Sequence, residues 1–160
     1  MRKFVTLTTI AVMMVGLGLS APEVSAKQKT PQQKVVKKAK QKLGCRYVYG
    51  ASGPRTFDCS GFVYYVYKKA NVKTKKKIKR TSCQSMYVSL KKYKISSKLK
   101  KAKAGDIILY KNGGRYTHAA LSLGKGKMIH ASWSKRKIVK AKANCVSHSS
   151  VAIIRVIKKK

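Results

Sequence analysis

The spacing of apolar residues changes near Lys103, and this change limits the folds that the chain can adopt. Before Lys103, apolar residues recur with a helical period in two segments, residues 30–44 and 59–70. After Lys103, apolar and polar residues alternate in segments separated by glycine turns, as in half-buried strands. Because the helices precede the strands, the pattern predicts an α+β fold in which N-terminal helices pack on an antiparallel β-sheet.

Capping and turn residues place the individual elements. Thr30 can cap the first helix, and a shorter helix over residues 81–90 can begin at Thr81 or Ser82. The lysine-rich segment 71–80 is interpreted as a solvated connection between helices. The expected strands are one strand after a turn, a hairpin and a final β-branched strand, at residues 104–110, 115–133 and 150–158.

Residues 1–26 have the order of a secretory signal peptide. Two basic residues precede an apolar run, and small residues then lead to an expected cleavage site after Ala26. A membrane anchor is the alternative, but threonines interrupt the run, which is also short for a membrane span. We therefore expect a secreted, cell-wall protein without a stable membrane anchor, and a single domain over residues 27–160.

The net charge is extreme, because 39 Lys and Arg stand against three Asp and Glu, for a formal charge of +36. Cleavage would remove Arg2, Lys3 and Glu23, and would leave Asp58 and Asp106 as the acidic residues. Such a charge attracts polyanions, which outside a cell include wall polymers, anionic lipids and nucleic acid. The alternative is a basic surface without a dedicated partner. No nucleic-acid-binding signature accompanies the lysines, so we expect no specific nucleic-acid partner.

Cysteine usage leaves the redox state of the chain open. The four cysteines could form two disulfides in three connectivities, or one if a single thiol stays free as a nucleophile. No CxxC pair and no zinc-ligand spacing occurs, so we expect no metal and no cofactor. The cysteines are Cys45, Cys59, Cys83 and Cys145.

Cys59 is the candidate nucleophile. It falls in the first turn of the helix over residues 59–70, and Asp58 is placed to cap that helix. The N–H groups of a helix N-terminus favour a thiolate and can also receive an oxyanion. Because Asp58 alone would oppose thiolate formation, a partner such as a histidine is required.

The hairpin supplies two candidate partners, His118 and His130. If the turn around residues 124–126 holds an odd number of residues, the two histidines share one face of the sheet as diagonal neighbours. A two-residue turn would place them on opposite faces. In the first case, His118 would be the base toward Cys59, and His130 would orient the far ring nitrogen of His118.

The two faces of this hairpin differ in character. The histidine face is expected to be mostly small and polar, and the other face is expected in the core, with Ala119, Leu121, Leu123, Ile129, Ala131 and Trp133. Taken singly, a cysteine at a helix start is often structural, and a strand histidine is often only exposed or satisfied. His148 is interpreted as a surface residue. The joint placement of the cysteine and the hairpin histidines favours nucleophilic catalysis.

Several segments, in order, resemble the NlpC/P60 family of cell-wall cysteine peptidases: LGCRYVYGASGPRTFDCSGFVYYVY, RTSCQSMY, AGDIILY and THAALSLGKGKMIHAS. The resemblance spans roughly residues 33–157. It implies a reduced papain-like fold, with the nucleophilic cysteine at a helix N-terminus. The residues that it assigns are a catalytic set, Cys59, His118 and His130, and a substrate-binding set, Tyr47, Asp58 and Ser60.

The resemblance implies hydrolysis of the peptide stems of peptidoglycan, most often at the bond between γ-D-glutamate and a diamino acid. We expect a monomer whose lysine-rich surface holds it on anionic wall polymers. Cys83 and Cys45 depart from the family pattern, which usually lacks a cysteine at these positions. The alternatives are a non-catalytic basic module that binds wall polymer or nucleic acid, and a related thiol amidase or acyltransferase.

Overall fold

The computed structural model of the chain describes residues 28–158, so the expected signal peptide over residues 1–26 lies outside it. A capping side chain precedes each α-helix of the described part. Thr30, Asp58 and Ser82 each accept a hydrogen bond from a backbone N–H of the first helical turn. The helices are α1 (Pro31–Lys40), α2 (Cys59–Ala70) and α3 (Cys83–Leu90). All three predicted helices are therefore confirmed, with Ser82 as the cap of α3.

The strands form one sheet in the order β2-β1-β7-β6-β5-β4-β8-β3. Their bounds are β1 (Arg46–Tyr47), β2 (Thr56–Phe57), β3 (Lys94–Ser96), β4 (Ile107–Asn112), β5 (Arg115–Gly124), β6 (Lys127–Ser132), β7 (Lys137–Lys142) and β8 (Ser150–Ile154). Neighbouring strands from β7 to β8 are all antiparallel, which confirms the predicted sheet. The sequence prediction missed β7, in which lysines fill the exposed positions and only Ile138 is fully buried.

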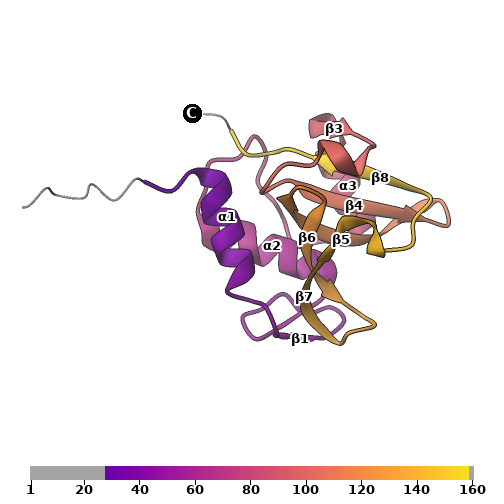
Figure 1. The fold of residues 1–160 in the computed structure, drawn as a ribbon, viewed down its shortest axis with the longest axis horizontal. Coiled ribbons are helices and arrows are strands. Elements are labelled where there is room, and N and C mark those ends of the chain that lie inside the picture. Colours follow the sequence, from indigo (N-terminus) through magenta and orange to yellow (C-terminus); the bar gives the residue numbers. More distant parts are fainter. Residues whose placement is uncertain (1–27, 159–160) are drawn as a thin grey trace, which may run out of the picture.

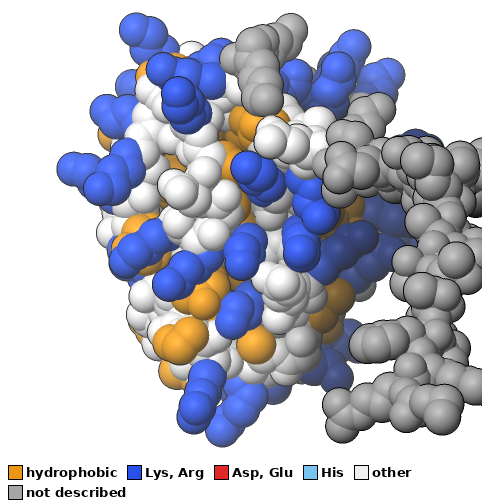
Figure 2. Space-filling model, turned by 90° about the vertical axis from the view of Figure 1, so that its left-hand side faces the viewer, with side chains coloured by type: hydrophobic (Ala, Val, Ile, Leu, Met, Phe, Trp, Pro, Cys, Tyr) orange, Lys and Arg blue, Asp and Glu red, His pale blue; other side chains and the backbone are white. Residues whose placement is uncertain are grey.

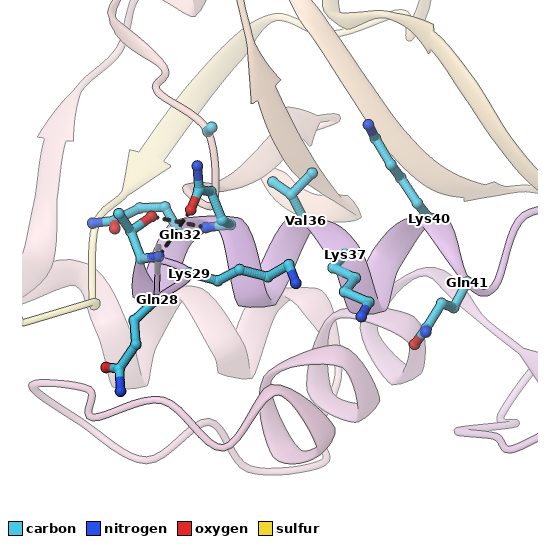
Figure 3. Close-up of a pocket in the computed structure, with 10 residues that line it drawn as sticks. Gln28, Lys29, Gln32, Val36, Lys37, Lys40 and Gln41 are labelled. Atoms are coloured by element: carbon cyan, nitrogen blue, oxygen red, sulfur yellow. Dashed lines mark hydrogen bonds between the residues drawn. The ribbon is translucent and has the colours of Figure 1, made fainter. Parts of the chain in front are cut away.

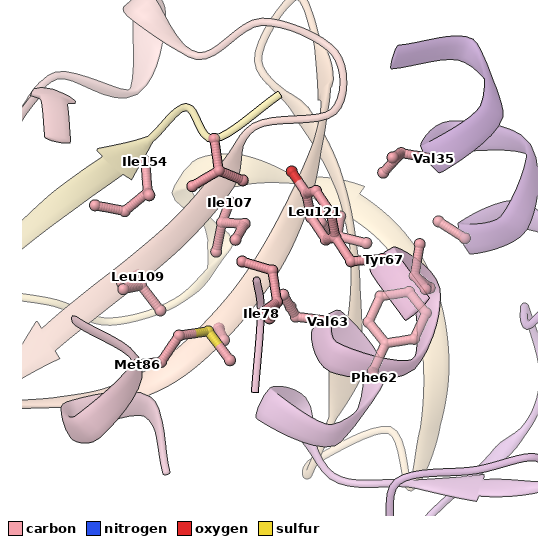
Figure 4. Packing of buried hydrophobic residues seen from close by; sticks show 14 of the residues in the cluster. Val35, Phe62, Val63, Tyr67, Ile78, Met86, Ile107, Leu109, Leu121 and Ile154 are labelled. Atoms are coloured by element: carbon pink, nitrogen blue, oxygen red, sulfur yellow. The ribbon is translucent and has the colours of Figure 1, made fainter. Parts of the chain in front are cut away.

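The main core lies between the helices and one face of the sheet (Figure 1). Side chains from α2 and α3 pack there against side chains from the central strands (Figure 4). The labelled members of this core are Val35, Phe62, Val63, Tyr67, Ile78, Met86, Ile107, Leu109, Leu121 and Ile154. Burial of such side chains stabilises a fold by about 1.5–3 kcal/mol each. The packing fixes the N-terminus of α2 relative to β5 and β6, which α2 contacts directly.

The opposite face of the sheet carries a second buried cluster. The histidine face carries the expected small and polar residues, but it is also buried, because Ala120 and Met128 pack there with Ile108, Tyr110 and Ile153. The prediction for Trp133 is wrong, since this side chain is 60% exposed. The central strands therefore carry buried apolar side chains on both faces of the sheet.

The β5–β6 hairpin places the two histidines on one face, as predicted, but its turn differs from the expected one. Its turn holds two residues, Lys125 and Gly126, both with positive φ, between the paired residues Gly124 and Lys127. A two-residue turn alone would separate the two histidines. A bulge beyond Ser122 shifts the register, however, and the histidines therefore share one face.

Gly61 allows a loop to approach the start of α2 closely. A Cβ atom at Gly61 would lie 2.2 Å from the carbonyl oxygen of Ala51 and 2.9 Å from the Cα of Ser52. The same Ala51 oxygen accepts a hydrogen bond from Asp58 N–H at 2.8 Å. The loop before β2 is thereby held against the first turn of α2, beside the candidate nucleophile.

Candidate active site

Cys59 is the first residue of α2, and two groups from other elements contact its thiol. Its Sγ lies 3.5 Å from the Sγ of Cys83, at the start of α3, and it also interacts with the side chain of His118 in β5. The hydrogen bond with Cys83 is the largest cause that lowers the pKa of Cys59, to about 5. The hydrogen bond and charge of His118 lower this pKa further, whereas burial opposes them. The site is therefore built to hold a thiolate.

The two predicted histidines are in direct contact. His118 Nε2 lies 2.9 Å from His130 Nδ1, and the two rings are nearly perpendicular, at 89°. Burial, and then the charge of His118, lowers the pKa of His130 to about 4. A neutral His130 can accept a hydrogen bond at Nδ1 from Nε2–H of His118, and this hydrogen bond fixes the orientation of the His118 ring. The contact also leaves Nδ1 of His118 for the thiol of Cys59.

Tyr110, from the second buried cluster, packs beside the ring of His118. Its ring centroid lies 5.8 Å from that of His118 and 5.4 Å from that of His148. The surface prediction for His148 is wrong, because this side chain is half-buried and its Nδ1 lies 2.5 Å from the carbonyl oxygen of Val146. The second cluster therefore restrains the far side of the His118 ring.

Asp58 orders the start of α2 through both carboxylate oxygens. Oδ1 accepts hydrogen bonds from Gly61 N–H at 2.6 Å and from the Ser60 hydroxyl at 2.9 Å. Oδ2 accepts hydrogen bonds from Gly50 N–H at 3.0 Å and from Arg80 Nη2 at 2.5 Å. Four donors thus occupy the carboxylate, which is the full capacity of two oxygens.

Arg80 is a site residue that the sequence prediction missed. It ends the segment 71–80, which was interpreted as a solvated connection. Besides Asp58, its guanidinium donates to the Ser60 hydroxyl at 2.9 Å and to the carbonyl oxygen of Gly50 at 3.0 Å. The available signal was an arginine at the end of a lysine run, because arginine suits multipoint hydrogen bonding better than lysine.

A hollow of about 440 Å³ collects the predicted substrate-binding residues around the nucleophile. Its wall includes Tyr47, Asp58, Cys59, Ser60, Arg80, Cys83, Arg115 and Tyr116. Burial is the largest cause that raises the pKa of Tyr47 to about 12, and the neighbouring Cys59 and Asp58 raise it further. The resemblance therefore selected side chains that do lie together, and Arg80 and Arg115 add positive charge.

A second hollow, of about 670 Å³, lies on the histidine side of the site. His118 and His130 line it together with Ser132, Trp133 and Lys135. The ring of Trp133 also meets that of Tyr47 edge to face, with centroids 5.5 Å apart. The exposed Trp133 side chain thus lines the second hollow and contacts Tyr47, which lines the first.

A third hollow, of about 760 Å³, runs along α1 and contains none of the predicted site residues (Figure 3). Glutamine and lysine side chains line most of it, including Gln28, Lys29, Gln32, Lys37, Lys40 and Gln41.

Within residues 28–158, no three His, Cys, Asp or Glu side chains are grouped so that they could hold a metal ion. No helix of this part is long and apolar enough to cross a membrane.

The helices on an antiparallel sheet, with a cysteine at a helix N-terminus opposite a histidine pair, define a papain-like domain. A sequence model of the NlpC/P60 family matches residues 44–155. This chain belongs to the NlpC/P60 family. The crystal structure of the NlpC/p60 domain of the peptidoglycan hydrolase SagA has a TM-score of 0.62 and 28% sequence identity, and covers 76% of this chain and 97% of that one.

The curated relatives are longer than this chain, which matches only a part of each. "Probable endopeptidase p60" of Listeria monocytogenes is 35% identical over 97 residues, which are 61% of this chain and 18% of the relative. "Gamma-DL-glutamyl hydrolase" of Bacillus subtilis is 31% identical over 145 residues, which cover 86% of this chain and 32% of the relative. The chain therefore spans about a fifth to a third of these relatives.

Proposed function

We propose that this chain is a secreted peptidoglycan hydrolase that acts as a cysteine endopeptidase on peptide stems, at the bond between γ-D-glutamate and a diamino acid. The observation that carries the proposal is the placement of Cys59 at the N-terminus of α2, where His118 lowers the pKa of its thiol and is itself oriented by His130. Family membership and relatives named as an endopeptidase and a gamma-DL-glutamyl hydrolase support the substrate class.

The proposed reaction begins with attack of the Cys59 thiolate on the amide carbon. Gly61 N–H is bonded to Asp58, and Phe62 N–H makes the first intrahelical bond, so the N–H groups of Cys59 and Ser60 remain for the oxyanion. His118 then donates its proton to the leaving amine, which separates and leaves a thioester on Cys59. Water, deprotonated by His118, hydrolyses the thioester and regenerates the thiolate.

The expected rate enhancement from these groups can be estimated from their roles. Positioned acid and base help contributes roughly 10²- to 10⁴-fold. An oxyanion donor contributes roughly 10²- to 10³-fold. His130 adds to the first contribution because it accepts a hydrogen bond from Nε2–H of His118 and thereby keeps His118 in one orientation.

Tyr47, Asp58 and Ser60 are the proposed substrate-binding residues on the nucleophile side, and Asp58 acts there through the groups that it holds, because four donors already occupy its carboxylate. Arg80 and Arg115 place positive charge in the same hollow, which suits the free carboxylate of a γ-linked glutamate. Asp58 also orders the site, because it holds Ser60 and Arg80 in place. The hollow beyond His118 and Trp133 would receive the part of the stem that carries the leaving amine.

The lysine-rich surface is the proposed means of retention on anionic wall polymers. Lys and Arg side chains are spread over the described surface in Figure 2, and no acidic side chain is visible among the coloured residues. The hollow along α1 adds Lys29, Lys37 and Lys40 beside several amides (Figure 3). Binding of the chain to isolated cell walls should therefore fall steeply with added salt. Retention that is unchanged in molar salt would contradict this part of the proposal.

The products of digestion test the proposed activity. Purified protein is incubated with muropeptides that carry diaminopimelate or lysine stems, and the products are identified by mass spectrometry. We expect fragments that end in γ-D-glutamate and fragments with a new free amine on the diamino acid. Cleavage at another amide would indicate a related thiol amidase or acyltransferase. Binding without any product would indicate the non-catalytic module.

A further inference from the structure

The proposed hydrolysis uses one thiol, but the site contains two. Cys59 begins α2 and Cys83 begins α3, and each follows a capped helix start, at Asp58 and Ser82 respectively. The two sulfur atoms lie 3.5 Å apart, and both residues line the hollow around the nucleophile. Two helix N-termini thus converge on one pair of sulfur atoms.

We propose that Cys83 is a resolving thiol, which closes a reversible disulfide with Cys59 and thereby blocks the nucleophile. This inference rests on the proposed function in one respect, since Cys59 must be the nucleophile for the disulfide to stop hydrolysis. The modification itself requires only the two thiols and an external disulfide. A low-molecular-weight disulfide is the oxidant in this scheme.

The exchange takes place in two balanced steps. The Cys59 thiolate attacks one sulfur of the external disulfide, forms a mixed disulfide and releases the first small thiolate. Cys83 then loses its proton and attacks Cys59 Sγ, so that the protein disulfide forms and the second small thiolate leaves. The two small thiolates take up protons. In total, two protein thiols are oxidised while one external disulfide is reduced to two thiols, and an excess of an external dithiol reverses the exchange.

The electrostatics of the pair suit this order of events. The pKa of Cys59 is lowered, so its thiol is the one that reacts first. The pKa of Cys83 is raised, chiefly by its hydrogen bond to Cys59 and then by burial. Formation of the mixed disulfide removes the negative charge of Cys59 and therefore the largest of these causes. Cys83, at the N-terminus of α3, can then ionise and attack.

The geometry requires only a short movement. A disulfide bond is about 2.05 Å long, so the two sulfur atoms, now 3.5 Å apart, must approach by roughly 1.5 Å. The other cysteines have different surroundings. Cys145 is exposed and lines the second hollow, whereas Cys45 is half-buried against the core. Within the described residues, Cys59 and Cys83 form the sulfur pair that is in contact.

The test uses the full chain, fully reduced and then exposed to hydroxyethyl disulfide. We expect the loss of the Cys59 and Cys83 thiols without a retained adduct on either residue, a tryptic map that joins the Cys59 and Cys83 peptides, and at least a 100-fold loss of muropeptide hydrolysis. Dithiothreitol should restore hydrolysis. Cys83→Ser and Cys83→Ala should instead retain a hydroxyethyl adduct on Cys59, whereas Cys145→Ser should form the cross-link as the wild type does.

Each other outcome overturns the proposal. A stable adduct on Cys59 in the wild type, or a cross-link from Cys59 to Cys45 or Cys145, would show that Cys83 does not resolve it. A Cys59–Cys83 cross-link that leaves hydrolysis unchanged would exclude its role as a switch. Hydrolysis by the reduced protein is measured first, so a failure of the proposed function is seen there, while peptide mapping still decides the cross-link.

Discussion

Arg80 holds Asp58 in place, with its Nη2 atom 2.5 Å from Oδ2 of the carboxylate. The other acidic residue of the described chain has the same kind of partner, since Arg155 Nη2 lies 2.7 Å from Oδ2 of Asp106. Lysine is far more abundant in this chain, but both carboxylates are paired with arginine, whose planar fork can reach several acceptors at once. The ion pair of Arg80 connects segment 71–80 to the first turn of α2.

Arg80→Met should weaken the site more than it weakens the fold. The variant leaves Oδ2 of Asp58 with the Gly50 donor alone and removes the donor to the Ser60 hydroxyl, which keeps only its bond to Oδ1 of Asp58. We expect muropeptide hydrolysis to fall about 10- to 100-fold. The Arg80 side chain is 31% exposed, so the free energy of unfolding should fall by only about 1–2 kcal/mol. Kinetics and urea unfolding measure both effects. Arg55→Met, at an exposed position, is the matched control, and equal losses in the two variants would contradict the assigned role.

The sequence predicted those features that depend on neighbouring residues. Helix starts follow from capping side chains within three positions, as at Asp58, and the core face of the hairpin follows from alternation. The arginine at the end of a lysine run was the one signal for Arg80, and it did not reveal the partner, which lies 22 positions away. The contact of Cys83 with Cys59 likewise depends on how α3 packs. The bulge beyond Ser122 depends on how β5 pairs with β6, and the alternation of apolar residues does not predict it.

Substitutions at His130 should separate its acceptor role from its packing. His130→Leu fills similar space but cannot accept a hydrogen bond from His118, so we expect kcat/KM to fall at least about 100-fold. His130→Gln retains an acceptor oxygen and should recover part of this loss. Steady-state kinetics with muropeptides measure both variants, and circular dichroism verifies their folding. Equal kcat/KM values in the two variants would show that the acceptor has no role.

His130 should also make the fold sensitive to acid. Its pKa is lowered to about 4 in the folded protein, below its ordinary value near 6.5. Between these values the unfolded chain binds more protons, so stability should fall as the pH decreases from about 6.5 to about 4, by roughly 3 kcal/mol at most. Urea unfolding of the wild type and His130→Gln measures this slope. We expect a smaller slope in the variant, and an identical slope would refute the assignment.

The reactivity of Cys59 should report the thiolate directly. The pKa of Cys59 is lowered to about 5, so its alkylation by iodoacetamide should rise with pH through a midpoint near that value. His118→Ala and Cys83→Ala should each move the midpoint upward, because each removes a hydrogen bond that lowers this pKa. Peptide mapping follows Cys59 separately from Cys145. A wild-type midpoint near 8 or above would contradict the proposed thiolate.

The central claim, that Cys59 is the nucleophile of a peptidoglycan hydrolase, is tested most directly by turnover of purified muropeptides. Wild-type protein, Cys59→Ala and Cys59→Ser are compared at equal concentration under reducing conditions, after their folding has been verified by thermal unfolding. We expect wild-type cleavage of the stem, and a rate at least about 10³-fold lower in both variants. Cleavage by Cys59→Ala at a rate near that of the wild type would contradict the account.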